Sequence, residues 1–188
     1  MERVDKILAH PEFQVYMRRI REQERTRVFC LHGIEHSLDV ARIGYIKNLE
    51  QGLSFRQDVI YAMALLHDIG RCEEYASGKS HHEAGAELAR PILLACGYTE
   101  HECAEICDAI GRHKAPSEQA RSLATLLYDA DKQSRNCFDC PVQEQCYWLE
   151  EKKNNSILSF IYKKNAVGKK TAAFLFMTGV KKLTKNKA

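Results

Sequence analysis

Apolar residues recur every three or four positions along most of the chain, and strict alternation of apolar and polar residues is nearly absent. This periodicity predicts helices and argues against strands. We expect seven helices, near residues 3–27, 34–51, 55–69, 81–96, 100–113, 117–135 and 141–153. Residues 154–188 are expected to be helical in pieces. The pattern therefore predicts an all-α bundle of about seven helices with a helical C-terminal extension.

Two kinds of residue mark the expected helix ends. A capping box, in which a Ser or Thr and a Glu or Gln three residues later bond to each other's backbone N–H, starts a helix. Glycine often follows the last turn, because it accepts the left-handed backbone conformation. The capping boxes are Ser54-x-x-Gln57, Ser80-x-x-Glu83 and Thr99-x-x-Glu102, and the expected terminating glycines are Gly52, Gly70 and Gly97.

The chain of 188 residues is long enough for one domain with a sizeable core. A boundary near Asn154 divides it into a domain at 1–153 and an extension at 154–188. The N-terminus lacks the apolar region of a secretory signal, and no apolar run approaches the roughly 20 residues that cross a bilayer. We therefore expect a cytoplasmic protein, whose eight cysteines are thiols or metal ligands rather than disulfides.

The C-terminal extension is strongly basic. Residues 163–188 hold eight lysines and no acidic residue, whereas the whole chain has a formal net charge of +3. The first 162 residues are therefore mildly acidic. An apolar stretch at 171–180 interrupts the lysines. Three interpretations stay open for this segment: packing on the core beside solvated lysines, contact with an anionic membrane surface, and binding of RNA or DNA.

Several histidines and aspartates fall on the apolar faces of the expected helices. A folded protein rarely buries a pair such as His67-Asp68 unless something compensates both groups. An inward carboxylate such as Asp131 needs a cation, several donors or a proton. A divalent metal would satisfy these groups together. The candidate ligands are His36, His67, Asp68, His82, His113 and Asp131.

The order of these residues resembles that of the HD domain superfamily of metal-dependent phosphohydrolases. The resemblance covers residues 30–135 and rests on three motifs: His32-Gly-Ile-Glu-His36-Ser-Leu, Leu-Leu-His67-Asp68-Ile-Gly, and Leu-Tyr-Asp-Ala-Asp131-Lys. It implies an all-helical core in which His36, His67, Asp68 and Asp131 gather on one metal.

Some branches of the superfamily hold a second metal through two further histidines. His82 and His113 stand where those ligands belong, and Asp68 would then bridge the two ions. This ligand order looks like that of the branch that hydrolyses symmetric dinucleoside tetraphosphates. His81 is expected to be a solvent-exposed or capping residue, because only one of two neighbouring histidines can face a given site. His32, one helical turn before His36, could line the pocket or lie at the surface.

Mixed histidine and carboxylate ligands suit iron, manganese, cobalt, nickel or zinc better than calcium. Such a metal produces hydroxide near neutral pH, and the expected reaction is attack on phosphorus in a nucleotide or similar small phosphorylated substrate. Two alternatives stay open. The chain could be a regulatory module that binds metal and nucleotide without turnover, or a nucleic-acid binder that uses its lysine-rich tail.

Developing negative charge needs fixed cations near the metal. Arg71 and Lys132 directly follow two of the ligand motifs and are expected, with Asp68, to serve catalysis. Further basic residues beside ligand motifs are Lys114 and Arg135, and Glu73 or Glu74 could donate a proton to the leaving group.

A possible second metal site lies in the run Cys137-Phe-Asp-Cys140-x5-Cys146. Two cysteines at Cys-x2-Cys spacing can bind one ion, as in structural zinc sites or iron–sulfur clusters. Only three cysteines are clustered, so the fourth ligand would come from Cys30, Cys72, Cys103 or Cys107. The alternative is three buried thiols without a metal.

Overall fold

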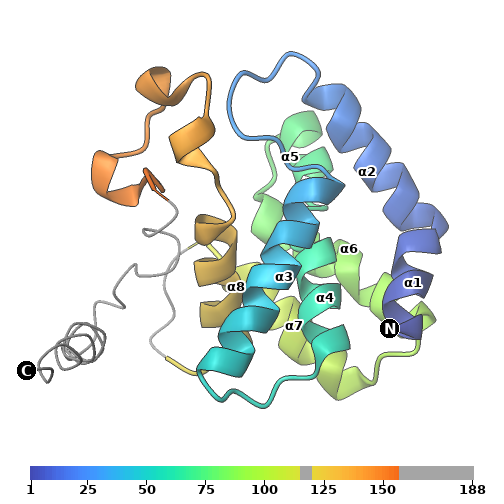
Figure 1. The fold of residues 1–188 in the computed structure, drawn as a ribbon. Helices are drawn as coiled ribbons and strands as arrows, with labels where there is room; N and C mark the ends of the chain where they lie inside the picture. The colour runs from blue at the N-terminus through green and yellow to red at the C-terminus, as the bar shows by residue number, and fades with distance from the viewer. Residues whose placement is uncertain (115–119, 157–188) are drawn as a thin grey trace, which may run out of the picture.

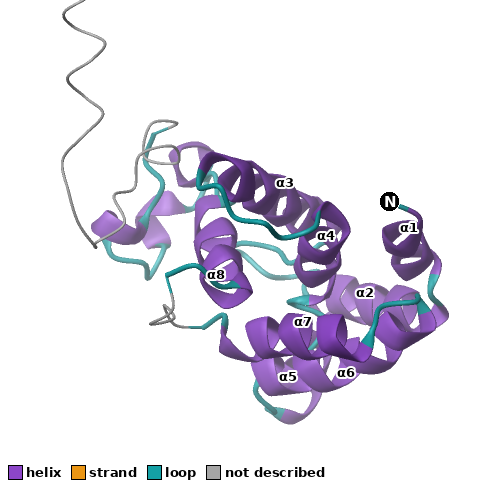
Figure 2. Cartoon of the chain, turned by 90° about the horizontal axis from the view of Figure 1, so that it is seen from below, coloured by secondary structure: helices purple, strands orange, loops and turns teal. Residues whose placement is uncertain are grey.

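The computed structural model describes residues 1–114 and 120–156, and these form helices and loops without a strand (Figure 1, Figure 2). The predicted all-helical fold is confirmed. No helix within the described residues is both long and apolar enough to span a bilayer. The α-helices are α1 (Glu2–Ala9), α2 (Pro11–Gln23), α3 (Ile34–Glu50), α4 (Gln57–Leu66), α5 (Arg71–Ser77), α6 (His81–Ala95), α7 (Glu100–Arg112) and α8 (Leu123–Gln133).

Helix α4 lies at the centre of the bundle and contacts α1, α3, α6, α7 and α8. Seven of its residues are buried, from Val59 to Leu66. A helix that is apolar on all sides belongs in the interior of a protein. Because His67 and Asp68 directly follow α4, the same burial carries both into the middle of the molecule.

The first expected helix, 3–27, is wrong as a single element. Pro11 divides it, because the residue before a proline is driven out of the helical region. His10 accordingly adopts φ −66° and ψ 127°, which is extended backbone. Pro11 then starts α2 at the first helical position, where its missing N–H costs nothing.

The interpretation of Gly70 as a helix terminator is also wrong. Gly70 has φ −67° and precedes α5, a helix that we did not expect. A Cβ atom at Gly70 would lie 2.2 Å from the carbonyl oxygen of His81 and 2.4 Å from the nitrogen of Gly85. Glycine is therefore needed because the chain passes close to α6. Gly52 and Gly97 do adopt positive φ, at 59° and 87°, so those two expectations are confirmed.

One of the three expected capping boxes is present. The Thr99 side chain accepts a hydrogen bond from the backbone N–H of Glu102, and the Glu102 carboxylate accepts one from Thr99 N–H. Ser80 occupies the N-cap position of α6, but its side chain makes no capping bond. The expectation for Ser54 is wrong, because α4 begins at Gln57 with Arg56 as its N-cap.

The helix expected at 141–153 is replaced by short 3-10 turns. These are η2 (Gln143–Gln145) and η3 (Glu150–Lys152), and another such turn, η1 (Cys137–Asp139), precedes them. Residues 137–156 lie on the side of the bundle opposite α1 and α2 (Figure 1). This segment is fastened by Asn154, whose side-chain nitrogen donates to the carbonyls of Lys132 (2.8 Å) and Arg135 (2.7 Å).

Asn154 is 1% exposed, so it packs against the described bundle. The domain boundary near this residue stays a prediction. Most of the basic extension expected at 154–188, namely residues 157–188, lies outside the described residues, as do residues 115–119. The predicted start of the helix at 117–135 falls among the undescribed residues 115–119, and the described part of that helix is α8.

Candidate metal centre

Three helices deliver four expected ligands to one point in the interior. His36 lies in the first turn of α3, and Asp131 lies in the last turn of α8. His67 is the C-terminal cap of α4, and Asp68 follows it. All four side chains are buried.

The distances among these four side chains suit a shared metal ion. His67 Nε2 lies 3.0 Å from Asp68 Oδ2 and 3.9 Å from Asp131 Oδ1. His36 Nε2 lies 3.6 Å and 3.3 Å from the same two oxygens. Two ligand atoms on one ion lie within about 4.2 Å of each other, because metal–nitrogen and metal–oxygen bonds are about 2.1 Å long. The observed separations all fall inside this limit.

His67 presents a free lone pair to the two carboxylates. Its Nδ1 lies 2.7 Å from the carbonyl oxygen of Ala64. A carbonyl only accepts, so Nδ1 carries the hydrogen and Nε2 holds the lone pair. Nε2 is buried and has no hydrogen-bond partner. Leaving a buried polar atom unpaired is costly, and a cation at this position would remove that cost. The donor set therefore fits a metal.

His36 is oriented in a similar way by Ser134. The Ser134 hydroxyl donates to the carbonyl of Asp131 (2.7 Å) and lies 3.1 Å from His36 Nδ1, from which it can only accept. The lone pair of His36 is then on Nε2, where the Arg135 guanidinium donates to it at 3.1 Å. Such bonds to the outer ring nitrogen fix the tautomer of a metal-binding histidine.

A second group of imidazoles lies on the other side of Asp68. Among the described residues, two sets of three ligand atoms lie within 4.8 Å of one another: His36, His67 and Asp68, and His81, His82 and His113. His113 Nδ1 donates to the carbonyl of Ile110 at 2.6 Å, which leaves the Nε2 lone pair facing Asp68 Oδ1 at 4.0 Å.

The expectation for His81 is wrong. We expected a solvent-exposed or capping side chain, but His81 is buried and its Nε2 lies 3.9 Å from Asp68 Oδ1. Its Nδ1 lies 2.8 Å from the Glu74 carboxylate. His82 is also buried, with Nδ1 3.3 Å from His113 Nδ1. Neighbouring histidines at the start of α6 therefore both belong to the second group.

His32 lines the cavity beside the centre, which decides between the two positions left open by the sequence. Its backbone N–H donates to the Glu24 carboxylate at 2.8 Å, and its Nδ1 contacts the same carboxylate. The Tyr75 hydroxyl also donates to Glu24, at 2.6 Å. The His32 ring meets the His36 ring edge to face, with centroids 5.9 Å apart.

The electrostatic environment keeps the two carboxylates in the ionised form that binds metal. Burial opposes a proton on His67, but the attraction of Asp68 outweighs this effect and raises the pKa of His67, so a bound metal would replace a proton on this ring. Burial alone would raise the pKa of Asp68, but His67 and Arg71 hold it well below its usual range. Burial similarly opposes ionisation of Asp131, and His36 and Lys132 lower its pKa. Both carboxylates are therefore ionised at neutral pH.

The second group of imidazoles is neutral under the same conditions. Burial and the neighbouring His67 lower the pKa of His113 to about 4. Burial and His113 lower the pKa of His82 to about 3. Burial and Arg71 also lower the pKa of His81. Neutral imidazoles and ionised carboxylates are the forms that bind metal.

Basic side chains surround the carboxylates and line a cavity of about 490 Å³. Arg71 Nε donates to Asp68 Oδ1 at 2.9 Å, and Lys132 Nζ donates to Asp131 Oδ2 at 2.7 Å. Arg135 also lines the cavity, with Nη2 3.6 Å from Asp131. The expected catalytic cations Arg71 and Lys132 thus both adjoin the centre.

Three further polar candidates, Glu73, Glu74 and Lys114, differ in their distance from the centre. Glu74 accepts from Arg71 at 3.1 Å and holds His81, whereas Glu73 faces Arg19 at 3.6 Å. Glu74 is therefore the one of this pair that adjoins the centre. Lys114 is exposed and does not line the cavity.

Sequence reasoning missed Ser134 and passed over His81. Ser134 lies three residues after Asp131, so helical spacing alone could have identified it as a neighbour. His81 gave no such signal, because its neighbour His82 fits the same motif position. The close packing of α6 against Gly70 carries both histidines inward.

A family model of the HD domain matches residues 33–136. An uncharacterized protein from Clostridium beijerinckii is 39% identical over 157 residues, which cover 84% of this chain and 99% of that protein. The chain therefore belongs to the HD domain family, and the resemblance noted in the sequence is confirmed.

Two further kinds of relative are similar over part of their length. Ribonuclease Y from Oceanobacillus iheyensis is 30% identical over 124 residues, which cover 65% of this chain but 21% of that protein. The chain thus spans about a fifth of the ribonuclease Y proteins that it matches. The crystal structure of a predicted HD superfamily hydrolase from an uncultured Thermotogales bacterium is similar at a TM-score of 0.50 and 28% identity, covering 65% of this chain and 68% of that one.

Proposed function

We propose that the chain is a metal-dependent phosphohydrolase that cleaves a phosphoester or phosphoanhydride in a nucleotide or similar small phosphorylated molecule. One observation carries the proposal: Asp68 lies between two groups of imidazoles. Its Oδ2 atom faces His36 and His67, and its Oδ1 atom faces His81 and His113. This arrangement supports a centre for two divalent ions with Asp68 between them.

The donor set indicates which residues would hold each ion. His36, His67, Asp68 and Asp131 would hold the first, and His82 and His113, together with Asp68 and the neighbouring His81, would hold the second. Nitrogen and oxygen donors in this mixture suit iron, manganese, cobalt, nickel or zinc. A bound ion of this kind polarises a phosphoryl oxygen and lowers the pKa of water toward about 7.

The surrounding side chains supply binding and charge stabilisation. Arg71 is fixed by Asp68 and Glu74, so its guanidinium is held rigidly at the cavity. Lys132 is 35% exposed in its side chain and can reach a phosphate in the cavity. Fixed cations aimed at developing negative charge stabilise the transition state. Trp148 lines the same cavity, and Lys132 Nζ lies over its ring, 5.7 Å from the ring centroid.

Turnover by the purified chain tests the proposal. The chain is supplied separately with each of the five metals and given nucleoside phosphates, dinucleoside polyphosphates and simple phosphodiesters. We expect phosphate or nucleotide release with at least one combination, and loss of that activity in Asp68→Ala. The matched control is Asp108→Ala, because Asp108 is an exposed residue paired with Arg112. Full metal content and tight nucleotide binding without any turnover would instead favour a regulatory module.

RNA is a second candidate substrate, favoured by the similarity to ribonuclease Y proteins. Its test is metal-dependent cleavage of a short labelled RNA, followed by gel electrophoresis. Removal of residues 163–188 separates tail binding from catalysis. If the lysines bind RNA, their removal weakens the affinity and flattens its salt dependence. Uncleaved RNA in the presence of active nucleotide hydrolysis would exclude this substrate.

A further inference from the structure

Four cysteines from two distant segments line the same cavity. Cys30 lies in the loop between α2 and α3, and Cys137, Cys140 and Cys146 lie in the segment after α8. All are free thiols. The sequence left four candidates for the partner of the clustered three, and Cys30 is the candidate that the cavity includes.

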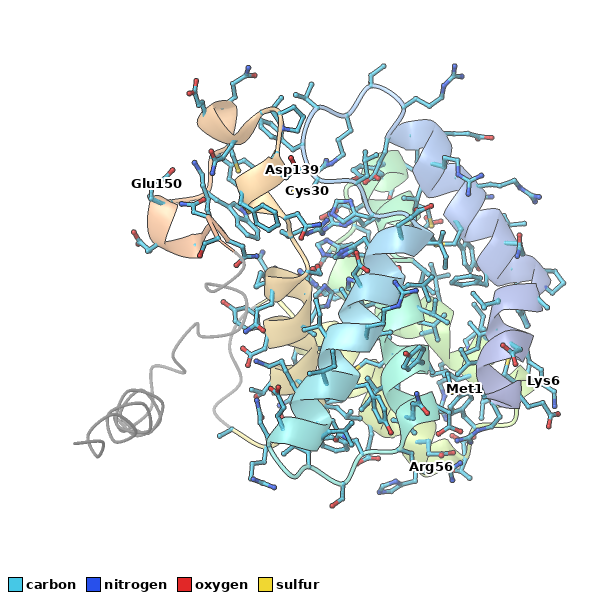
Figure 3. All side chains as sticks on the ribbon, viewed as in Figure 1. Met1, Lys6, Cys30, Arg56, Asp139 and Glu150 are labelled. Carbon is cyan, nitrogen blue, oxygen red and sulfur yellow. The ribbon has the colours of Figure 1, made fainter. Side chains whose placement is uncertain are left out.

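Other contacts hold these two segments together. The rings of Phe29 and Tyr147 meet edge to face, with centroids 5.9 Å apart. Arg135 donates to the carbonyl of Leu31 at 2.9 Å. Cys30 faces the segment that carries Asp139 (Figure 3). The position of Cys30 is therefore fixed by neighbours on both sides of it in the sequence.

The spacing of the sulfur atoms argues against a compact zinc site. Sulfurs that share one tetrahedral zinc lie about 3.8 Å apart, since each zinc–sulfur bond is about 2.3 Å long. Among the described residues, the cysteines form no group of three ligand atoms within 4.8 Å of one another. A four-iron cluster spaces its cysteine sulfurs more widely, because each sulfur binds a different iron atom.

Two basic side chains adjoin the thiols. Arg135 lies close enough to Cys30 to oppose the rise in its pKa that burial causes and that the other three thiols increase. Lys153 is buried and donates to the carbonyl of Gln143 at 3.0 Å, within the cysteine segment. Neighbouring cations favour the thiolate form of cysteine, which is the form that binds a cluster.

We propose that Cys30, Cys137, Cys140 and Cys146 bind a [4Fe–4S] cluster, which forms the wall of the cavity next to the histidine–aspartate centre. Each cysteine binds one iron atom through its thiolate. The cluster joins the loop before α3 to the segment after α8, and so fixes His32 and Arg135 on either side of the cavity. The site is separate from the ligands of the proposed hydrolytic centre.

Iron and acid-labile sulfide, measured on the full chain purified without oxygen, test this inference. We expect about four iron and four sulfide per chain beyond any iron at the histidine–aspartate centre, with broad visible absorption and an electron paramagnetic resonance signal after reduction. Sulfide belongs only to the cluster, so Asp68→Ala should retain it. This separates the inference from the proposed phosphohydrolase activity.

Single substitutions identify the ligands. Cys30→Ser and Cys140→Ser should lose most of the sulfide and the visible absorption, whereas Cys107→Ser, on α7 and outside the cavity lining, should keep both. One zinc per chain without sulfide would overturn the cluster, as would wild-type protein without sulfide. Retention of the full cluster by Cys30→Ser would overturn the assignment of the fourth ligand. The sulfide content of the wild-type protein tests whether the cluster is present even if a variant fails to fold.

Discussion

The hydroxyl of Ser134 lies 3.1 Å from Nδ1 of His36, although the two residues are 98 positions apart in the sequence. The same hydroxyl donates to the carbonyl of Asp131 at 2.7 Å. Ser134 thereby joins α3 to α8 at the point where each contributes a candidate ligand. The orientation of His36 depends on a side chain that would not itself touch a metal.

Ser134→Ala should lower metal affinity by about 10- to 100-fold, the usual cost of losing such a supporting bond. His36 would lose the acceptor that fixes its tautomer, while its own ligand atom would remain. Competition with a metal-binding dye measures the change. Ser77→Ala is the matched control, because Ser77 is exposed and its hydroxyl bonds only to the nearby backbone of Glu73 and Lys79. Equal affinities of the two variants would contradict the supporting role.

Arg71→Gln should reduce kcat/KM by about 10²- to 10³-fold, as expected when a preorganised charge at the transition state is removed. Arg71→Lys should recover little of the loss, since a lysine cannot bond to Asp68 and Glu74 in the same fork geometry. Steady-state kinetics on a substrate that the turnover assay identifies measures the change. Arg112→Gln is the control, because Arg112 is 63% exposed and paired with Asp108. Unchanged kcat/KM in Arg71→Gln would remove Arg71 from the catalytic machinery.

Gly70→Ala should destabilise the protein by about 3 kcal/mol, because the added methyl group meets backbone atoms of α6 that cannot move independently. It should also weaken metal binding, since His81 follows the same displacement. Urea unfolding and metal titration measure the two effects. Gly111→Ala should instead stabilise by about 0.5 kcal/mol, because nothing lies within 4 Å of a Cβ at Gly111. A Gly70→Ala variant as stable as wild type would contradict the close approach.

Arg3→Gln should lower stability by about 1–2 kcal/mol near neutral pH, because Arg3 bonds to carboxylates on two other helices. Its Nη2 lies 2.6 Å from Asp58, and its Nη1 lies 2.8 Å from Glu102. The hydrogen bond from Arg3 lowers the pKa of Glu102 from 4.5 to about 2. This contribution is fully present above pH 4.5 and is lost as the pH falls toward 2.

The difference in unfolding free energy between wild type and Arg3→Gln should therefore shrink below pH 4.5. Urea unfolding at a series of pH values measures it. Lys6→Gln is the control, because Lys6 forms an exposed pair with Glu2 on its own helix, and such pairs contribute little. A difference that stays constant down to pH 2 would rule out Glu102 as its source.

The sequence predicted the centre of the fold better than its edges. Burial of His36, His67 and Asp131 followed from apolar periodicity, because a residue on an apolar helix face has to point inward. The break between α1 and α2 was also predictable from Pro11 itself. We expected one helix because the apolar periodicity continues across the proline. The 3-10 turns after α8 were not encoded locally, because bonds from the distant Asn154 hold the segment in place.

The roles of Gly70 and Cys30 could not be predicted from their neighbours in the sequence, because both depend on contacts with distant segments. The need for glycine at position 70 comes from the backbone of α6, and the place of Cys30 comes from a segment more than a hundred residues later. Pattern analysis identifies residues of the right chemistry. It does not identify which of several cysteines tertiary packing will bring to a site, or that both of two adjacent histidines will reach it.

The bonds from Asn154 have a consequence for the order of folding during translation. Asn154 donates to the carbonyls of Lys132 and Arg135, which lie 22 and 19 positions earlier in the sequence. Both acceptors are therefore synthesised before their donor. A nascent chain can assemble the helical bundle first, but its cysteine segment gains this anchor only after residue 154 has left the ribosome. The cysteine segment therefore reaches its final position only after the helical bundle has been synthesised.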